Sequence, residues 1–154
     1  MQKVILYEKE ARDKIKIGID KAAGLVAKTL GPKGKAIFLK RSYISNQGHG
    51  LQHFPAQASK DGISVLRTIV LSDFIENMGV DLCKEASEKT MSSTGDSTTT
   101  TLVLLQSLVE LGLKAVDDGK NPFEVKEGID SAVARVVAQL EKMAIPVGDN
   151  IETI

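Results

Sequence analysis

The residues best suited to chemistry lie in a run of serines and threonines, Ser92-Ser93-Thr94-Gly95-Asp96-Ser97-Thr98-Thr99-Thr100-Thr101. Such residues are poor choices for a helix interior, because their hydroxyls compete for backbone hydrogen bonds. At the N-terminus of a helix they are useful, since unpaired amides, the helix dipole and the hydroxyls all favour a bound phosphate. Asp96 would repel that phosphate unless a divalent cation such as Mg²⁺ lay between them. The alternative is a capped loop without a ligand.

Two other polar loops could face an ion. In Thr29-Leu30-Gly31-Pro32-Lys33-Gly34 the glycines let backbone amides approach an anion closely, and Lys33 adds positive charge. The alternative is a simple helix end and turn. In Ser59-Lys60-Asp61-Gly62 the carboxylate of Asp61 could orient a water molecule or a cation, or could merely cap the next helix. The chain contains neither a Walker A nor a Rossmann glycine motif.

Composition argues against several functional classes. The 154 residues carry 20 Lys and Arg against 20 Asp and Glu, so the net charge is zero and no nucleic-acid partner is expected. Aromatic residues make up 4% and tryptophan is absent, which argues against stacking platforms for bases. The lone Cys83 excludes an internal disulfide framework. The chain has no apolar run long enough for a membrane span and no signal-peptide pattern, so we expect a cytoplasmic protein without a membrane partner.

The spacing of apolar residues predicts a mainly α fold, a bundle of long helices with a small β-hairpin. We expect helices over 11–30, 61–69, 73–94, 97–118 and 121–144. Phe74, Met78, Leu82 and Ala86 are spaced by four and are expected to lie along a single face of their helix. Strands are expected at 36–39 and, as an edge strand, at 4–7, with a polar stretch of little order over 42–59.

Several motifs together resemble those of a group I (GroEL-type) chaperonin, in the same order along nearly the whole chain. They are Thr29-Leu30-Gly31-Pro32-Lys33-Gly34, Lys60-Asp61-Gly62-Ile63-Ser64-Val65, Glu76-Asn77-Met78-Gly79, Gly95-Asp96-Ser97-Thr98-Thr99-Thr100, Gly112-Leu113-Lys114-Ala115-Val116, Gly119-Lys120-Asn121-Pro122 and Gly128-Ile129-Asp130. The resemblance implies that residues 1–144 are the N-terminal half of an equatorial, ATP-binding domain. Residues 145–154 would then begin the intermediate hinge region, truncated at the end of the sequence.

The resemblance also implies a role for individual residues. Thr29, Leu30, Gly31 and Pro32 would line the phosphates of ATP, and Ser97, Thr98, Thr99 and Thr100 would wrap them at a helix N-terminus. Asp96 would hold Mg²⁺, and Lys60 would lie beside the nucleotide and a monovalent cation such as K⁺. Asp61 matches a catalytic carboxylate that positions the attacking water.

Two features depart from the family pattern. Ser97 stands where the family has glycine, so its Cβ could change the geometry or affinity of nucleotide binding. The segment 42–59 is longer than the family's hairpin connection, which contacts a neighbouring subunit. Its two histidines, His49 and His53, lack nearby carboxylates and are expected to be solvated and not to bind a metal.

The function implied by the resemblance is that of an ATP-dependent protein-folding chaperonin subunit. Its partners would be other subunits in a ring and, through regions outside this sequence, unfolded client proteins. Because the family's second catalytic Asp belongs to a later segment, we expect these 154 residues alone to hydrolyse ATP negligibly. The alternative is a truncated, non-catalytic interaction module that docks on rings or partner helices.

Overall fold

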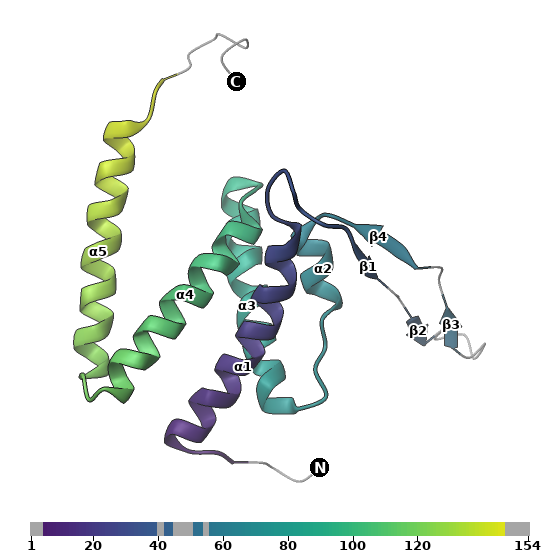
Figure 1. The fold of residues 1–154 in the computed structure, drawn as a ribbon, viewed down its shortest axis with the longest axis horizontal. Helices are drawn as coiled ribbons and strands as arrows, with labels where there is room; N and C mark the ends of the chain where they lie inside the picture. Colours follow the sequence, from purple (N-terminus) through teal and green to yellow (C-terminus); the bar gives the residue numbers. More distant parts are fainter. Residues whose placement is uncertain (1–4, 40–41, 45–50, 54–55, 147–154) are drawn as a thin grey trace. The chain divides into compact units, whose positions relative to one another are not determined.

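The computed structural model describes residues 5–39, 42–44, 51–53 and 56–146. Contacts divide the chain into two compact units, Met1–Glu110 and Leu111–Ile154. In chain order the elements are α1 (Glu8–Val26), the 3₁₀ turn η1 (Ala27–Thr29), β1 (Ile37–Leu39), β2 (Ser42–Ile44), β3 (Leu51–His53), β4 (Gln57–Ser59), α2 (Gly62–Thr68), α3 (Phe74–Thr94), α4 (Thr98–Asp117) and α5 (Pro122–Met143) (Figure 1). The predicted mainly α fold with a small β-ribbon is confirmed.

The helix ends follow the predicted capping residues. Asp73 Oδ1 accepts hydrogen bonds from the amides of Ile75 and Glu76 at 2.9 and 3.1 Å, which caps α3. Lys14 donates to the same carboxylate and, with these amides, holds the pKa of Asp73 below its ordinary value. At the other end of α3, Gly95 takes a left-handed φ of +76°, which ends the helix.

The core of the first unit lies where α1 packs on α3. Its fully or nearly buried apolar residues are Ile19, Ala22, Ala23, Val26, Leu39, Val65, Leu66, Val80, Cys83 and Leu102. The two helix backbones approach closely at Gly18 and Gly79: a Cβ on Gly18 would lie 1.8 Å from the carbonyl oxygen of Glu76. Lys21 pairs with Glu76 at 2.5 Å beside this crossing. Small residues therefore set the distance between α1 and α3.

The apolar residues that the sequence places along a single face of α3 do not form its buried face. Phe74, Met78 and Leu82 are 70%, 44% and 47% exposed, although their spacing by four is correct. The buried stripe consists of Gly79, Val80, Cys83 and Ser87, whose small side chains admit α1. Because α3 carries two apolar stripes, periodicity alone could not decide which of them packs against the core.

Among the described residues of 42–59, β2, β3 and β4 are strands, which corrects the expectation of a polar stretch with little order for these residues. β1 pairs antiparallel with β4, with Ile37 opposite Ser59, and β2 pairs with β3, with Ser42 opposite His53. His49 lies outside the described residues, so nothing can be said of its surroundings. Residues 5–7 are not a strand: they lead directly into α1, and Tyr7 occupies its N-cap position.

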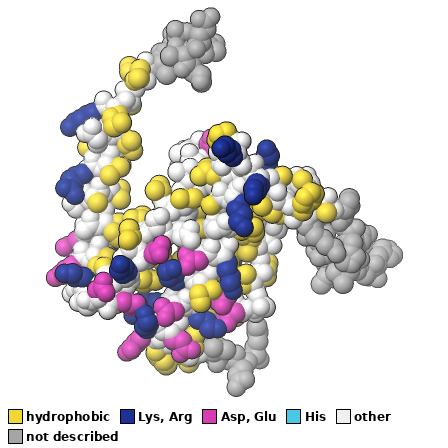
Figure 2. Space-filling model, viewed as in Figure 1, with side chains coloured by type: hydrophobic (Ala, Val, Ile, Leu, Met, Phe, Trp, Pro, Cys, Tyr) yellow, Lys and Arg dark blue, Asp and Glu magenta, His cyan; other side chains and the backbone are white. Residues whose placement is uncertain are grey.

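The second unit consists of the last part of α4 and of α5. Asn121 Oδ1 accepts the amide of Phe123 at 2.9 Å, and Pro122 starts α5, as predicted. The side chains of Val125 and Ile129 lie over Gly112, 3.8 and 4.0 Å from the position of its missing Cβ. Figure 2 shows further hydrophobic side chains along α5, and acidic and basic side chains intermixed over the first unit.

Among the described helices, α4 alone is long and apolar enough to cross a membrane by length and composition. Core helices of soluble proteins pass the same test. Leu102 of α4 is buried in the core of the first unit, and Leu105 and Val109 pack against that core. Leu104 and Leu108 of the same helix are 58% and 43% exposed, so packing against the core covers only part of its apolar surface.

Candidate functional site

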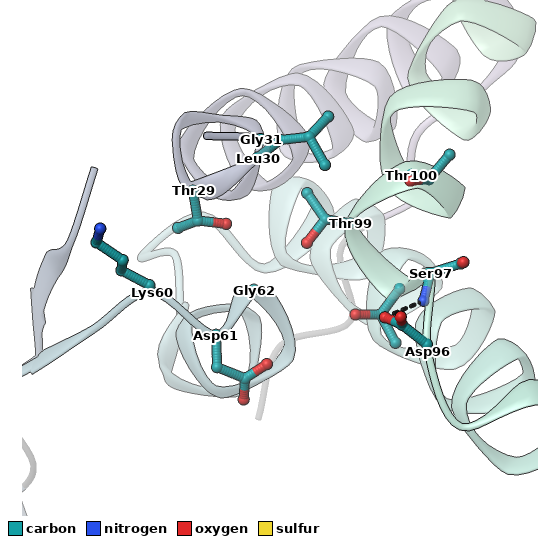
Figure 3. Close-up of a pocket in the computed structure, with 11 residues that line it drawn as sticks. Thr29, Leu30, Gly31, Lys60, Asp61, Gly62, Asp96, Ser97, Thr99 and Thr100 are labelled. Atoms are coloured by element: carbon teal, nitrogen blue, oxygen red, sulfur yellow. Dashed lines mark hydrogen bonds between the residues drawn. The ribbon is translucent and has the colours of Figure 1, made fainter. Parts of the chain in front are cut away.

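A pocket of about 350 Å³ lies in the first unit, where three separate segments of the chain meet (Figure 3). They are the turn after η1, the start of α2 and the start of α4. The lining residues are Thr29, Leu30, Gly31, Lys60, Asp61, Gly62, Asp96, Ser97, Thr98, Thr99 and Thr100. The structure thus brings together every predicted site residue except Pro32, and adds Gly62.

The turn after η1 forms one wall of the pocket. The Thr29 hydroxyl donates to the carbonyl of Val26 at 2.8 Å, which closes the last helical turn. Gly31 then takes a φ of +76°, a value that glycine adopts without strain. The interpretation of this motif as a helix end and turn is therefore confirmed, and the turn also faces the pocket.

Lys60 and Asp61 approach the pocket from the start of α2. Asp61 Oδ2 accepts the Ser64 amide at 3.2 Å and also the Ser64 hydroxyl, so Asp61 is the N-cap of α2. The capping interpretation is confirmed, and it does not remove Asp61 from the pocket. In Figure 3, Lys60, Thr29 and Asp61 lie on one side, Asp96 and Ser97 lie on the other, and Thr99 lies between the two groups.

Gly62 is the site residue that sequence reasoning missed. A Cβ at this position would lie 2.1 Å from Thr99 Oγ1 and 2.9 Å from Val26 Cγ1. Glycine at this position therefore leaves room for the side chains of Thr99 and Val26 against the start of α2. The signal was present, since Gly62 directly follows Asp61 in one of the motifs, but a sequence alone does not show which distant side chains approach it.

The start of α4 supplies amides and hydroxyls. Its first intrahelical hydrogen bond runs from the Thr101 amide to the Ser97 carbonyl at 3.0 Å, so the amides of Thr98, Thr99 and Thr100 precede the helical ladder. Ser97 has a φ of +67°, a left-handed value that is rare outside glycine and asparagine. The Ser97 amide donates to Asp96 Oδ1 at 2.6 Å. Ser97 thus adopts a conformation suited to glycine, the residue that the resemblance to group I chaperonins implies at this position.

Charge in the pocket is balanced by the helix end. Lys60 is opposed by Asp61 and Asp96, so the charged lining side chains sum to one negative charge. The N-terminus of α4 adds a partial positive charge beside Asp96. Among the described residues there is no group of three His, Cys, Asp or Glu side chains that could hold a metal ion alone. A cation here would need oxygen ligands from a bound anion and from water, which is typical of Mg²⁺ with phosphates.

Comparison with known proteins identifies the family. The sequence model of the TCP-1/cpn60 chaperonin family matches residues 23–154. The chain belongs to this family. Its structure is similar to the crystal structure of the chaperonin gp146 from the bacteriophage EL 2 (Pseudomonas aeruginosa) in the presence of ATP-BeFx, with a TM-score of 0.74 and 28% sequence identity.

The similarity covers 96% of this chain and 24% of the phage chaperonin. The chaperonin chain described here thus spans about a quarter of the length of that relative. Its fold is that of a chaperonin equatorial domain, as the motifs predicted.

Proposed function

We propose that this chaperonin chain contributes the phosphate-binding part of a Mg-ATP site. The observation that carries the proposal is the convergence of three distant segments, 29–31, 60–62 and 96–100, on one pocket. Together, the three segments bring groups that suit a polyphosphate: backbone amides, hydroxyls, a lysine and two carboxylates. Pro32 would act from outside the lining, by fixing the turn that presents Gly31.

The residues fit the cofactor by the chemistry of their donor groups. The amides of Thr98, Thr99 and Thr100 and their hydroxyls would donate to phosphate oxygens. Asp96 would hold Mg²⁺ together with those oxygens, which removes the repulsion between the carboxylate and the phosphates. Lys60 would add positive charge, and K⁺ is a second cation that this polar site could take. Bound Mg²⁺ would supply charge neutralisation for phosphoryl transfer.

In a full subunit, ATP would drive a ring-shaped, protein-folding chaperonin. Asp61 would orient an attacking water, and its place in the pocket lining at the start of α2 supports this role. The other ring subunits and the unfolded client proteins would bind through surfaces of the longer protein. The lone Cys83, which is buried and unpaired with any other cysteine, accords with a cytoplasmic location.

Isothermal titration of the purified chain with Mg-ATP tests the proposal. We expect binding by the native chain and a loss of at least about tenfold in affinity for Asp96→Ala, because that change removes the carboxylate proposed to hold the metal. Asp130→Ala is the matched control: Asp130 is an exposed aspartate on α5 that pairs with Lys126 at 2.5 Å, away from the lining residues. Its affinity should equal that of the native chain.

Two results would contradict the proposal. Mg-ATP binding that is unchanged in Asp96→Ala would place the nucleotide elsewhere. No binding by a correctly folded native chain would instead favour a non-catalytic chaperonin-like module that docks on rings or partner helices.

Hydrolysis is a separate question from binding. The carboxylates that line the pocket are Asp61 and Asp96, and the second of these is assigned to the metal. Asp61 alone is then left to act on water, and the second catalytic Asp that the family resemblance implies belongs to a later segment. We therefore expect these 154 residues to bind Mg-ATP but to release phosphate negligibly. A clear turnover rate that Asp61→Ala abolishes would overturn this expectation.

A further inference from the structure

Thr101 lies one helical turn beyond Ser97, outside the residues that line the pocket. Its hydroxyl donates to the Ser97 carbonyl at 3.0 Å, and its amide donates to the same oxygen at 3.0 Å. A single residue thus supplies two hydrogen bonds to one carbonyl. The hydroxyls of Thr101 and Thr90 are also 3.0 Å apart, which links the start of α4 to α3.

The number of hydroxyl hydrogens limits which hydrogen bonds Thr90 and Thr101 can make at the same time. Each hydroxyl carries one hydrogen, and the Thr90 hydroxyl also lies 3.1 Å from the carbonyl of Ala86. When Thr101 donates to Ser97, a hydrogen between the two hydroxyls comes only from Thr90, and Thr90 then gives up its bond to the Ala86 carbonyl. The hydrogen bonds of Thr101 to Ser97 therefore do not depend on which of these two acceptors Thr90 serves.

Ser97 needs such support, because its backbone is strained. A left-handed φ places the Cβ of an L-residue close to backbone oxygen, and such a conformation persists only when its surroundings determine it. On the N-terminal side, Asp96 Oδ1 accepts the Ser97 amide at 2.6 Å. On the C-terminal side, Thr101 makes both hydrogen bonds to the carbonyl. The peptide groups on both sides of Ser97 are held.

We propose that Thr101 is a positioning residue for the pocket, which acts by holding Ser97 in the left-handed conformation. In that conformation the Ser97 amide orients the Asp96 carboxylate, and the amides of Thr98 to Thr100 face the pocket. The effect on ligand rests on the proposed Mg-ATP site, whereas the effect on Ser97 does not. Glycine would need no such support, so the role of Thr101 depends on the residue at 97.

Four variants of the full chain form the test: Thr101→Val, Thr101→Ser, Ser97→Gly and the double variant Thr101→Val with Ser97→Gly. Valine keeps the shape of threonine and removes the hydroxyl, whereas serine keeps the hydroxyl. We expect Thr101→Val to raise the Kd for Mg-ATP about fivefold in the native background. In the Ser97→Gly background, Thr101→Val should alter the Kd less than about twofold relative to Ser97→Gly alone. Thr101→Ser should bind Mg-ATP as the native chain does.

An equal loss of affinity in both backgrounds would overturn the proposal, because Thr101 would then act without regard to Ser97. An unchanged affinity in Thr101→Val would overturn it as well. Loss of binding in Thr101→Ser would show that the methyl group, and not the hydroxyl, matters.

A ligand-free measurement separates this proposal from the proposed function. The urea midpoints of the same variants form a double-mutant cycle, in which Thr101→Val should destabilise the native chain more than it destabilises Ser97→Gly. Failure of the native chain to bind Mg-ATP would contradict the proposed function, and the cycle would then decide the role of Thr101. If the effects of Thr101→Val and Ser97→Gly on the urea midpoint simply add, the proposed role of Thr101 is overturned.

Discussion

Ser97 is a serine in a backbone conformation that favours glycine. Its φ of +67° should cost stability, because the Cβ is crowded by backbone oxygen. We expect Ser97→Gly to raise the free energy of unfolding by about 0.5–1 kcal/mol, after subtraction of the extra freedom of glycine in the unfolded chain. Urea unfolding at constant m value measures this change.

Ser93→Gly is the matched control. Ser93 lies within α3 and is not among the residues that line the pocket. Its hydroxyl donates to the carbonyl of Lys89 or Thr90, both at 3.0 Å. Glycine in a helix interior is destabilising, so this substitution should lower the free energy of unfolding by about 0.5 kcal/mol. The same chemical change would then have opposite signs at two sites. Equal effects at both would contradict the strain at Ser97.

Cys83 is a second residue whose setting determines its chemistry. Burial, with a smaller contribution from Asp20, raises the pKa of its thiol from 9.0 to about 11. The unfolded chain loses this proton near pH 9 and the native chain near pH 11, so the native state holds more protons between these values. Stability should therefore fall as pH rises through this window.

A thiol-reactive dye checks the setting of Cys83. Native chain at pH 8 should react very slowly, and urea-unfolded chain should react at once, because only the unfolded thiol is accessible and partly ionised. Cys83→Ser should remove the alkaline slope of the urea midpoint. Rapid labelling of the native chain would contradict the buried position of this residue.

At the scale of elements, α1 and α3 are held at close range by glycine. A Cβ at Gly18 would lie 1.8 Å from the Glu76 carbonyl oxygen, whereas a Cβ at Gly24 of the same helix would meet nothing within 4 Å. We expect Gly18→Ala to destabilise the chain by at least about 2 kcal/mol, because the helices must separate. Gly24→Ala should stabilise it by about 0.5–1 kcal/mol through helix propensity.

Thermal unfolding of these two variants, followed by far-UV circular dichroism, gives the comparison. Both substitutions add the same methyl group to α1, so any difference in sign comes from the contact with α3. A stable Gly18→Ala chain would mean that α1 and α3 do not cross at this point.

Elements were largely predictable from the sequence, whereas their buried faces were less so. Gly31, Asp61, Asp73, Gly95 and Asn121 mark helix ends by local chemistry, which a sequence shows directly. Phe74, Met78 and Leu82 form a regular apolar stripe in the sequence but are exposed, because a spacing of four does not show which side of α3 is buried. The strands within 42–59 were missed, since their pairing joins segments that carry no strong alternation.

The pocket was predictable because its residues occur in motifs. Gly62 was not, because its role is a close approach of its backbone to the side chains of Thr99 and Val26. Its missing Cβ would lie against Thr99, a residue 37 positions later in the chain (99 minus 62). No local pattern in the sequence reports such a long-range approach. The left-handed φ of Ser97 was likewise hidden, since serine gives no signal for it.

At the scale of the whole molecule, the pocket belongs to the first of the two units. All eleven lining residues lie between Thr29 and Thr100, within Met1–Glu110. Mg-ATP should therefore slow amide hydrogen exchange at 29–31, 60–62 and 96–101, and leave exchange in α5 unchanged. Mass spectrometry of peptides after exchange, with and without Mg-ATP, measures both regions.

A uniform slowing throughout both units would contradict a ligand site confined to the first. Slowing in α5 alone would place the ligand on the second unit. The Asp96→Ala chain is the control, since it should show the ligand-free pattern at every peptide.

The helix α4 begins at the pocket with Thr98, and its part within the first unit ends at Glu110. These 13 residues (110 minus 98, plus 1) span about 18 Å along the helix axis. A tilt of about 5° at the first turn would therefore carry Glu110 sideways by about 1.6 Å. A small adjustment around Thr98 thus becomes, at Glu110, a displacement of about the length of a carbon–carbon bond.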